Sequence, residues 1–476
     1  MEFILAPNGR GFSKVRFILG ELSRFDGKTL SIGYGNSKPL NRRKLIVLMR
    51  KVVALAKQNR IKKLDIHWKD IRVLAPKDMG DYEIGRIAGT AFIMADYEHV
   101  AYKSTPKEGW NVVEQMCIPN TPVAGKEGFW HGSIIGEEIN ACRELSNTPG
   151  GDMTPKRLAA SAVAAAKRSG AGKKLKVKVL GRREMQRLGM GAVLGVAKGA
   201  ADEPQFIVME YRGAGRPVSQ TSKSKSDLLK KPIVLIGKGV TFDTGGIQVK
   251  TGDHMYEMHM DMSGGAAVIH ALVLAAKLKI KTNVVGLVPA VENAVGAGAM
   301  RPGDILKSLS GRTIEILHTD AEGRVILADA LSYAKRYSPA VVADAATLTG
   351  AALTGLGEQA SAIMTNREDM LADLQTLGEE SGDYVWPFPL WEEYDYIVKG
   401  RFGDVPNIPA QGNSRYAGII GGGKFLEVFA KDLNCPWLHL DIASVMTAAE
   451  GHHLARGAAG APVRYFLALI EKYATH

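Results

Sequence analysis

The feature that most constrains the fold is a series of short apolar segments that alternate with helix-like stretches from Leu175 onward. Strands that are apolar throughout, rather than at every second position, are typical of a sheet buried on both faces. Alternation with helices favours parallel strands, because each helix returns the chain to the same edge. The expected strands are residues 176–180, 205–210, 233–236, 283–288, 313–317, 341–345 and 437–441. The sequence therefore predicts an α/β fold with a mixed, largely parallel sheet sandwiched by helices.

The first 132 residues differ from the rest, because they mix short apolar runs with amphipathic stretches and contain no catalytic pattern. They predict a smaller α/β domain. A helix-like stretch then leads into the proline- and glycine-rich segment 147–155, which is typical of a junction. We therefore expect an N-terminal α/β domain over 1–132, a linker helix and junction over 133–158, and a C-terminal catalytic domain over 159–476.

Several whole-chain properties limit the setting in which the protein works. Three cysteines without a CxxC pair argue against a disulfide framework and a cysteine zinc site. The chain starts without a signal-peptide pattern and has no apolar run of membrane-spanning length, so we expect a soluble cytoplasmic protein without a membrane partner. The net charge of +12 can attract polyanions, although the basic residues are dispersed. Nucleic-acid contact therefore stays open beside a solvated basic surface.

Charged residues follow one of the expected strands and precede a helix. Lys238 and Asp243 lie in a glycine-rich segment directly after 233–236, and Asp261 comes just before an alanine-rich helix. In such sheets, ligands bind where loops leave the carboxyl ends of the strands. The order of residues around Lys238 does not fit a phosphate-binding P-loop, which needs GxxxxGK followed by Ser or Thr. Asp261 alone fits a helix N-cap as well as a ligand.

A third cluster follows the expected strand 313–317, where Asp320 and Glu322 are separated by one residue and Arg324 comes close behind. Two carboxylates this close repel each other unless a cation lies between them. The alternative is a pair of acids at a helix start, favoured by the helix dipole, with Arg324 as their partner. The loop by itself leaves both interpretations open.

Together the clusters supply ligands for two divalent ions: the oxygens of Asp243, Asp261, Asp320 and Glu322, and the nitrogen of Lys238. Two-metal hydrolases use such a set, with a bridging carboxylate, to polarise a carbonyl and activate water. A lysine binds metal only as the neutral amine, so Lys238 would have to lose its proton. His318, beside the acids, stays open as a further ligand. The chain lacks the HExxH and GxSxG motifs of common zinc and serine hydrolases.

Four motifs give the sequence a close resemblance to a known family. They are GKGVTFDTGG at 237–246, MRPGDIL at 300–306, HTDAEGR at 318–324 and DAATLTGA at 344–351. Through them the chain, from about Ala141 to its end, resembles the leucyl aminopeptidase family of two-metal cytosolic peptidases. The resemblance implies a metal-dependent aminopeptidase that releases N-terminal amino acids from peptides, preferentially leucine or similar apolar residues.

The resemblance also implies a role for each matching residue. The tighter metal would be held by Lys238, Asp243, Asp261 and Glu322, and the more exchangeable one by Asp243, Asp320 and Glu322. Lys250 matches the family's catalytic lysine, and Arg324 matches an arginine that anchors a bicarbonate ion acting as general base. The implied substrate pocket is lined by Met258, Thr347, Gly350, Ala443 and Met446. The ions would be manganese or zinc, and oxygen-rich ligation is also compatible with magnesium.

The implied partners are peptides with a free N-terminus and further copies of this chain, in a homohexamer of two stacked trimers. His318, Gln248 and His259 depart from the usual family pattern, which leaves substrate preference, metal preference and pH optimum open. Two alternatives remain. One is a nucleic-acid-binding role, since some members of the family act on DNA as architectural factors, and the other is a hydrolase of dipeptides such as Cys-Gly.

Overall fold

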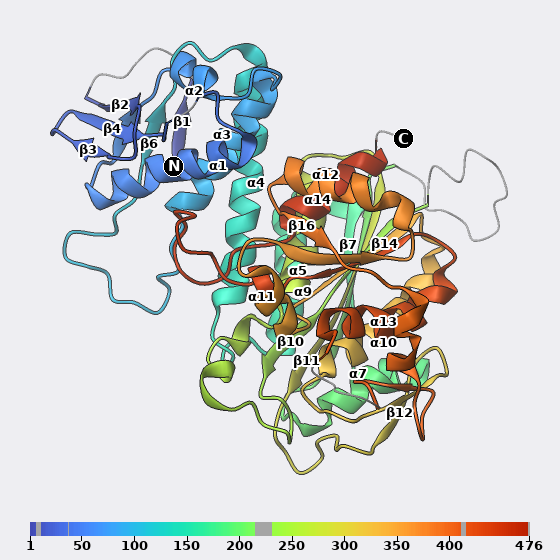
Figure 1. Ribbon diagram of the computed structural model, residues 1–476. Helices are drawn as coiled ribbons and strands as arrows, with labels where there is room; N and C mark the ends of the chain where they lie inside the picture. Colours follow the sequence, from blue (N-terminus) through green and yellow to red (C-terminus); the bar gives the residue numbers. More distant parts are fainter. Residues whose placement is uncertain (6–10, 37, 215–230, 411–415, 475–476) are drawn as a thin grey trace. The chain divides into compact units, whose positions relative to one another are not determined.

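The computed structural model describes residues 1–5, 11–36, 38–214, 231–410 and 416–474 (Figure 1). The chain divides into two compact units. The first consists of Met1–Asn140 and Ala448–Gly457, and the second of Ala141–Thr447 and Ala458–His476. The boundary at 140/141 falls within helix α4 (Val123–Asn147), which overlaps the expected linker at 133–158.

The first unit is an α/β unit built on a six-stranded sheet in the order β1-β6-β5-β2-β4-β3. Its strand pairs are parallel except for β3 with β4. Helix α1 begins after Asn41, whose side chain accepts a hydrogen bond from the backbone N of Lys44. The elements are β1 (Glu2–Ile4), β2 (Ser13–Ile18), β3 (Arg24–Phe25), β4 (Thr29–Gly33), α1 (Arg42–Gln58), β5 (Lys63–Asp65), α2 (Trp68–Leu74), α3 (Asp81–Asp96) and β6 (Gln115–Cys117). The expected smaller N-terminal α/β part is confirmed.

The second unit is built on a nine-stranded sheet in the order β16-β15-β18-β14-β9-β11-β8-β7, with β10 also paired to β11. The central strands are parallel, whereas β8 runs antiparallel to β7 and β11, and β15 runs antiparallel to β18. The strands are β7 (Leu175–Leu180), β8 (Gln205–Arg212), β9 (Ile233–Gly237), β10 (Gly239–Asp243), β11 (Asn283–Asn293), β14 (Val341–Ala346), β15 (Ser361–Thr365), β16 (Val385–Pro387) and β18 (Trp437–Asp441). The expected mixed, largely parallel sheet is therefore confirmed.

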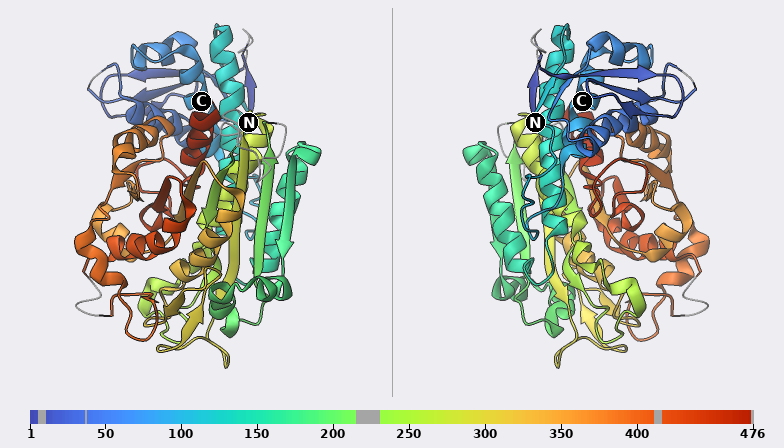
Figure 2. Two further views of the ribbon diagram at one scale, coloured as in Figure 1. Left: turned by 90° about the vertical axis from the view of Figure 1, so that its right-hand side faces the viewer. Right: turned by 90° about the vertical axis from the view of Figure 1, so that its left-hand side faces the viewer.

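Helices lie on both sides of this sheet (Figure 2). Helix α9 contacts β9, β11 and β14 and also packs against α5 and α14. Residues of α7, α10 and α13 share one hydrophobic core with Val234 and Ile236 of β9. The helices of this unit are α5 (Pro155–Arg168), α6 (Arg182–Leu188), α7 (Gly191–Val196), α9 (Ser263–Lys277), α10 (Glu322–Ala334), α11 (Gly350–Leu356), α12 (Leu371–Ser381), α13 (Gly418–Ala430) and α14 (Val463–Ala474).

One segment of the described chain, Gly252–Lys277, has the length and apolarity needed to cross a membrane. However, 89% of its most apolar window is buried inside the structure. This segment contains α9, whose residues pack on the sheet. Its apolar character is therefore that of a core helix.

The expected strand at 313–317 does not belong to the large sheet. The observed strand β13 (Thr313–Glu315) pairs with β12 (Ile305–Lys307) and β17 (Val405–Pro406) in a separate three-stranded sheet. The prediction that all acidic clusters follow strands of one sheet is therefore wrong for Asp320 and Glu322. An apolar run indicates a strand but not its partner, and β17 lies about ninety residues away in the chain.

Candidate functional site

A cavity of about 1180 Å³ opens in the second unit, among residues that follow the ends of β9, β10, β14 and β18. All of the site residues expected from the sequence line it except Glu322: Lys238, Asp243, Lys250, Met258, Asp261, Asp320, Arg324, Thr347, Gly350, Ala443 and Met446. Glu322 lies next to this lining, because its Oε1 is 2.8 Å from Nζ of Lys238. The structure thus brings the whole expected set together.

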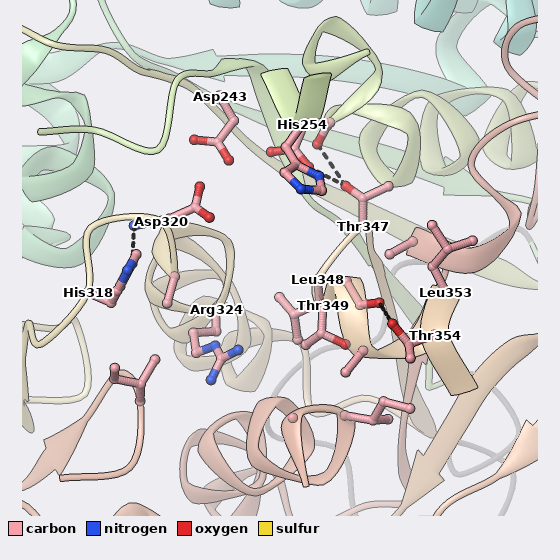
Figure 3. A pocket seen from close by; sticks show the side chains of 18 of the residues that line it. Asp243, His254, His318, Asp320, Arg324, Thr347, Leu348, Thr349, Leu353 and Thr354 are labelled. Carbon is pink, nitrogen blue, oxygen red and sulfur yellow. Dashed lines mark hydrogen bonds between the residues drawn. The ribbon is translucent and has the colours of Figure 1, made fainter. Parts of the chain in front are cut away.

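Three carboxylates form the centre of the site. Asp243 is the last residue of β10, Glu322 is the first residue of α10, and Asp320 lies in the loop just before α10. Each of them offers an oxygen atom, and these atoms lie within 4.8 Å of one another. Figure 3 shows the carboxylates of Asp243 and Asp320 facing each other across the cavity.

Asp261 reaches the site from the segment before α9. The N-cap position of α9 is Met262, so the alternative role of Asp261 as N-cap is not realised. Its Oδ1 instead accepts a hydrogen bond of 2.5 Å from Oγ1 of Thr347, which follows β14. Asp261 therefore faces the other ligand candidates rather than the end of its own helix.

Two lysines hold the four carboxylates together. Nζ of Lys238 lies 2.9 Å from Oδ1 of Asp261 and 2.8 Å from Oε1 of Glu322, and it also donates to the backbone O of Thr347 at 2.9 Å. Nζ of Lys250 lies 2.8 Å from Oδ2 of Asp243 and also pairs with Asp320. The ammonium groups thus supply the positive charge that this acidic cluster needs.

Burial makes the negative charges costly to hold. It raises the pKa of Asp261 to about 8, of Glu322 to about 7 and of Asp320 to about 6, and repulsion from the Asp243 carboxylate adds to each rise. Burial by itself lowers the pKa of Lys238, but the nearby carboxylates of Asp261 and Glu322 outweigh it and raise that pKa. Lys238 is therefore held as a cation here, and a metal would have to displace its proton.

The buried oxygens show how well a metal would fit. Oε2 of Glu322 and Oδ2 of Asp261 are buried without a hydrogen-bond or ion-pair partner among the described residues. Buried polar atoms are nearly always satisfied, so such oxygens need a ligand. Carboxylate oxygens with one amine nitrogen suit divalent ions such as manganese, zinc and magnesium. The residues present therefore fit the expected metals.

Arg324 lies below the acids in Figure 3, on the first turn of α10. Its Nη1 donates to the backbone O of Asn407 at 2.9 Å, and its buried Nε has no hydrogen-bond partner in the part of the chain that the structure describes. Burial lowers its pKa to about 10, against the opposing effect of Asp441 and Glu322. Within the described chain it forms no ion pair with Asp320 or Glu322. The alternative in which Arg324 serves as the partner of helix-start acids is therefore not observed.

His318 lines the cavity, and its ring faces its own loop. Nδ1 of the ring accepts a hydrogen bond from the backbone N of Asp320 at 3.2 Å (Figure 3). Burial lowers the pKa of His318, and the charge of Lys250 lowers it further. This nitrogen is therefore already engaged by the backbone.

Two buried asparagines that sequence reasoning missed position the acidic residues. Nδ2 of Asn293 donates to Oδ1 of Asp243 at 2.7 Å and to the backbone O of Thr319 at 3.1 Å. Oδ1 of Asn407 accepts from the backbone N of Leu317 at 2.8 Å, and its Nδ2 donates to the backbone O of His318 at 2.6 Å. Asn293 ends the apolar strand β11, so the strand-end rule could have found it.

The other side of the cavity is apolar. Beside the expected Met258 and Met446, the lining includes Phe388 and Ile419. These two residues pack with Ala443 in a small hydrophobic cluster of the second unit. The cavity therefore combines a carboxylate-rich end with a region suited to an apolar side chain.

Comparison with known proteins gives consistent matches. The model of the cytosol aminopeptidase family, catalytic domain, matches residues 140–467. A probable cytosol aminopeptidase of Azoarcus sp. (strain BH72) is 46% identical over 332 residues, which cover 70% of this chain and 61% of that protein. Another, of Syntrophotalea carbinolica, is 46% identical over 339 residues, which cover 71% of this chain and 64% of that protein. The chain thus spans less than two thirds of the length of these relatives.

Solved structures also match nearly the whole chain, and one of them illustrates the likeness. It is the bottromycin maturation enzyme BotP, which is 26% identical and superimposes with a TM-score of 0.82. The match covers 98% of this chain and 100% of that protein. The likeness therefore extends over both compact units.

Proposed function

This chain belongs to the cytosol aminopeptidase family, and from that premise we propose that it is a metal-dependent aminopeptidase. It removes N-terminal amino acids from peptides and prefers leucine or similar apolar residues. The observation that carries the proposal is the convergence of four buried or half-buried carboxylates with Lys238 and Lys250 in one cavity.

We assign two divalent ions, manganese or zinc with magnesium as a further candidate, to this cluster. One ion would be held by Lys238, Asp243, Asp261 and Glu322, and the other by Asp243, Asp320 and Glu322. When bound, such ions polarise the scissile carbonyl and make a water molecule acidic enough to attack near neutral pH. Oε2 of Glu322 and Oδ2 of Asp261, which have no partner among the described residues, support this assignment.

Lys250 and Arg324 supply the remaining polar chemistry. Nζ of Lys250 sits against Asp243 and Asp320, so it can donate to the oxyanion that forms from the scissile carbonyl. The buried Nε of Arg324 has no hydrogen-bond partner among the described residues, and it offers this donor to a small anion such as bicarbonate. A bound anion there would act as a general base.

The shape of the cavity supports the substrate class. Its carboxylate end, with the ions bound, would hold the neutral form of a free amino group, and its apolar side receives the first side chain through Met258, Ala443 and Met446. A peptide with a blocked N-terminus would lose the first of these interactions. A homohexameric assembly and a cytoplasmic location belong to the same proposal, and a native mass of six chains would support the assembly.

The test is the release of p-nitroaniline from leucine-p-nitroanilide by metal-stripped protein and by protein restored with Mn²⁺ or Zn²⁺. Asp320→Ala is compared with Asp369→Ala, whose carboxylate is exposed and pairs only with exposed Arg367 in the described chain. Turnover that requires metal, is lost in Asp320→Ala and persists in Asp369→Ala supports the proposal. Well-folded, metal-loaded protein that is inert toward this and other amino-acid anilides would refute it.

Two further measurements separate the alternatives. Competition among Leu-Gly, Cys-Gly and Met-Ala distinguishes a broad aminopeptidase from a hydrolase of Cys-Gly. A nucleic-acid role predicts DNA binding that weakens steeply with salt and survives loss of Asp320. Absence of DNA binding near physiological salt would dismiss that role.

A further inference from the structure

An uncharged side chain joins the two loops that carry the acids of the site. Gln248 lies between Asp243 and Lys250, and Thr319 directly precedes Asp320. The backbone N of Gln248 donates to Oγ1 of Thr319 at 3.0 Å, and the backbone N of Thr319 donates to Oε1 of Gln248 at 2.8 Å. The two residues thus form a closed pair of hydrogen bonds between the loops.

Thr319 is fully buried, and the surrounding residues use its remaining polar atoms. Its Oγ1 donates to the backbone O of Gly245 at 2.6 Å, and its backbone O accepts from Nδ2 of Asn293 at 3.1 Å. Among the described residues, the backbone N–H of Thr319 donates to Oε1 of Gln248. Loss of this oxygen would leave a buried donor without a partner, which is more costly than loss of an exposed hydrogen bond.

The hydrogen bonds between Gln248 and Thr319 link the two loops at the place where repulsion between their carboxylates would push them apart. Oxygen atoms of Asp243, Asp320 and Glu322 lie within 4.8 Å of one another, and like charges at this distance repel. The loops also approach closely, because a Cβ built on Gly245 would lie only 3.1 Å from Oδ1 of Asp320. A link between the two backbones holds them at this spacing in the absence of a metal.

We propose that Gln248 is a positioning residue whose side-chain carbonyl holds the Asp320 loop against the Asp243 loop at the spacing that the shared metal site requires. This inference rests on the proposed function, because it treats the acidic cluster as a metal site. The backbone N of residue 248 can still reach Thr319 after substitution, so a side-chain variant removes only one of the two bonds. The side-chain carbonyl is therefore the atom to test.

The experiment measures Mn²⁺ binding to metal-stripped protein by titration calorimetry. Gln248→Met keeps the size of the side chain without the acceptor, Gln248→Ser is too short to reach Thr319, and Gln248→Glu keeps an oxygen at the same reach. Loss of a group that orients metal ligands typically weakens metal affinity by about 10- to 100-fold, so we expect that loss in the Met and Ser variants. Gln248→Glu should bind Mn²⁺ at least as well as the parent protein. Ile247→Ala, at an exposed neighbour outside the cavity lining, should bind normally.

Thermal unfolding in chelator separates positioning from a purely structural role. A residue that only stabilises the fold would lower the unfolding temperature and leave the Mn²⁺ affinity of the folded protein unchanged. Parent-like affinity in Gln248→Met, or equal losses in the Met and Glu variants, would overturn the inference. If Gln248→Met does not fold, Gln248→Ser decides in its place. Failure of the proposed function would give a different result. The parent protein and the Gln248 variants would then show the expected order of Mn²⁺ affinities, but the parent protein would release no amino acid.

Discussion

The substitution Gly323→Ala tests whether the position of Lys238 controls the reaction. Gly323 is the second residue of α10, and a Cβ built there would lie 2.7 Å from both Cε and Nζ of Lys238. Unbonded carbon atoms pack best at about 3.5–4.0 Å, so the end of Lys238 must retreat by about 1 Å. This movement takes Nζ away from Asp261 and Glu322, which it now contacts at 2.9 and 2.8 Å. A misplacement of about 1 Å can cost about 100-fold in rate, and we expect kcat to fall by that order.

The same substitution should leave folding nearly unchanged. The displaced atoms belong to the end of a flexible side chain, and alanine is the better helix former by about 1 kcal/mol. We would measure initial rates on leucine-p-nitroanilide with saturating Mn²⁺, and the free energy of unfolding in chelator by urea denaturation. Gly421→Ala in α13 is the matched control, because its Cβ would meet only Cγ2 of Ile397 at an ordinary 3.6 Å. A Gly323→Ala protein with parent-like kcat and metal requirement would refute the reasoning.

Three further predictions follow from the charges of the site and from the apolar side of the cavity. Mn²⁺ affinity should rise from pH 6 to pH 8 in titration calorimetry, because metal must displace protons from Asp320, Glu322 and Asp261, whose pKa values are about 6, 7 and 8. Because these pKa values are raised, the folded, metal-free protein binds more protons than the unfolded chain. Its free energy of unfolding in urea should therefore fall as pH rises from 6 to 8. A Mn²⁺ affinity and a free energy of unfolding that do not change with pH would contradict these two predictions. Ala443→Phe should fill the apolar side of the cavity and lower kcat/KM for leucine-p-nitroanilide by about tenfold more than for alanine-p-nitroanilide, whereas equal losses would place the side-chain pocket elsewhere.

The large sheet and the ligand candidates could be predicted because their signals are local. Apolar runs such as 233–236 identify strands, and the charged residues directly after them identify the edge at which ligands bind. The close spacing of Asp320 and Glu322 left a helix start open as an alternative, and it indicated a cation only together with Lys238, Asp243 and Asp261. These inferences needed no knowledge of which strands are neighbours.

Other features depend on pairings that no local pattern encodes. The residues of β13, Thr-Ile-Glu, indicate a strand but not its partner, and β13 pairs with Val405–Pro406 far along the chain in a second sheet. Asn407 is similar, since nothing in its sequence neighbourhood indicates that it will hold the loop before α10. The sequence identified Gln248 only as a departure from the usual family pattern. It could not predict the two hydrogen bonds by which Gln248 connects to Thr319.

The discontinuity of the first compact unit has a consequence for protein engineering. The chain leaves this unit at 140/141 and returns for Ala448–Gly457, where Leu454 packs against the hydrophobic core of the first unit. A single proteolytic cut within α4 would therefore leave the N-terminal fragment without a part of its own core. A chimera that takes residues 1–140 from a relative must also take the matching return segment, so the N-terminal part cannot be exchanged as one continuous cassette.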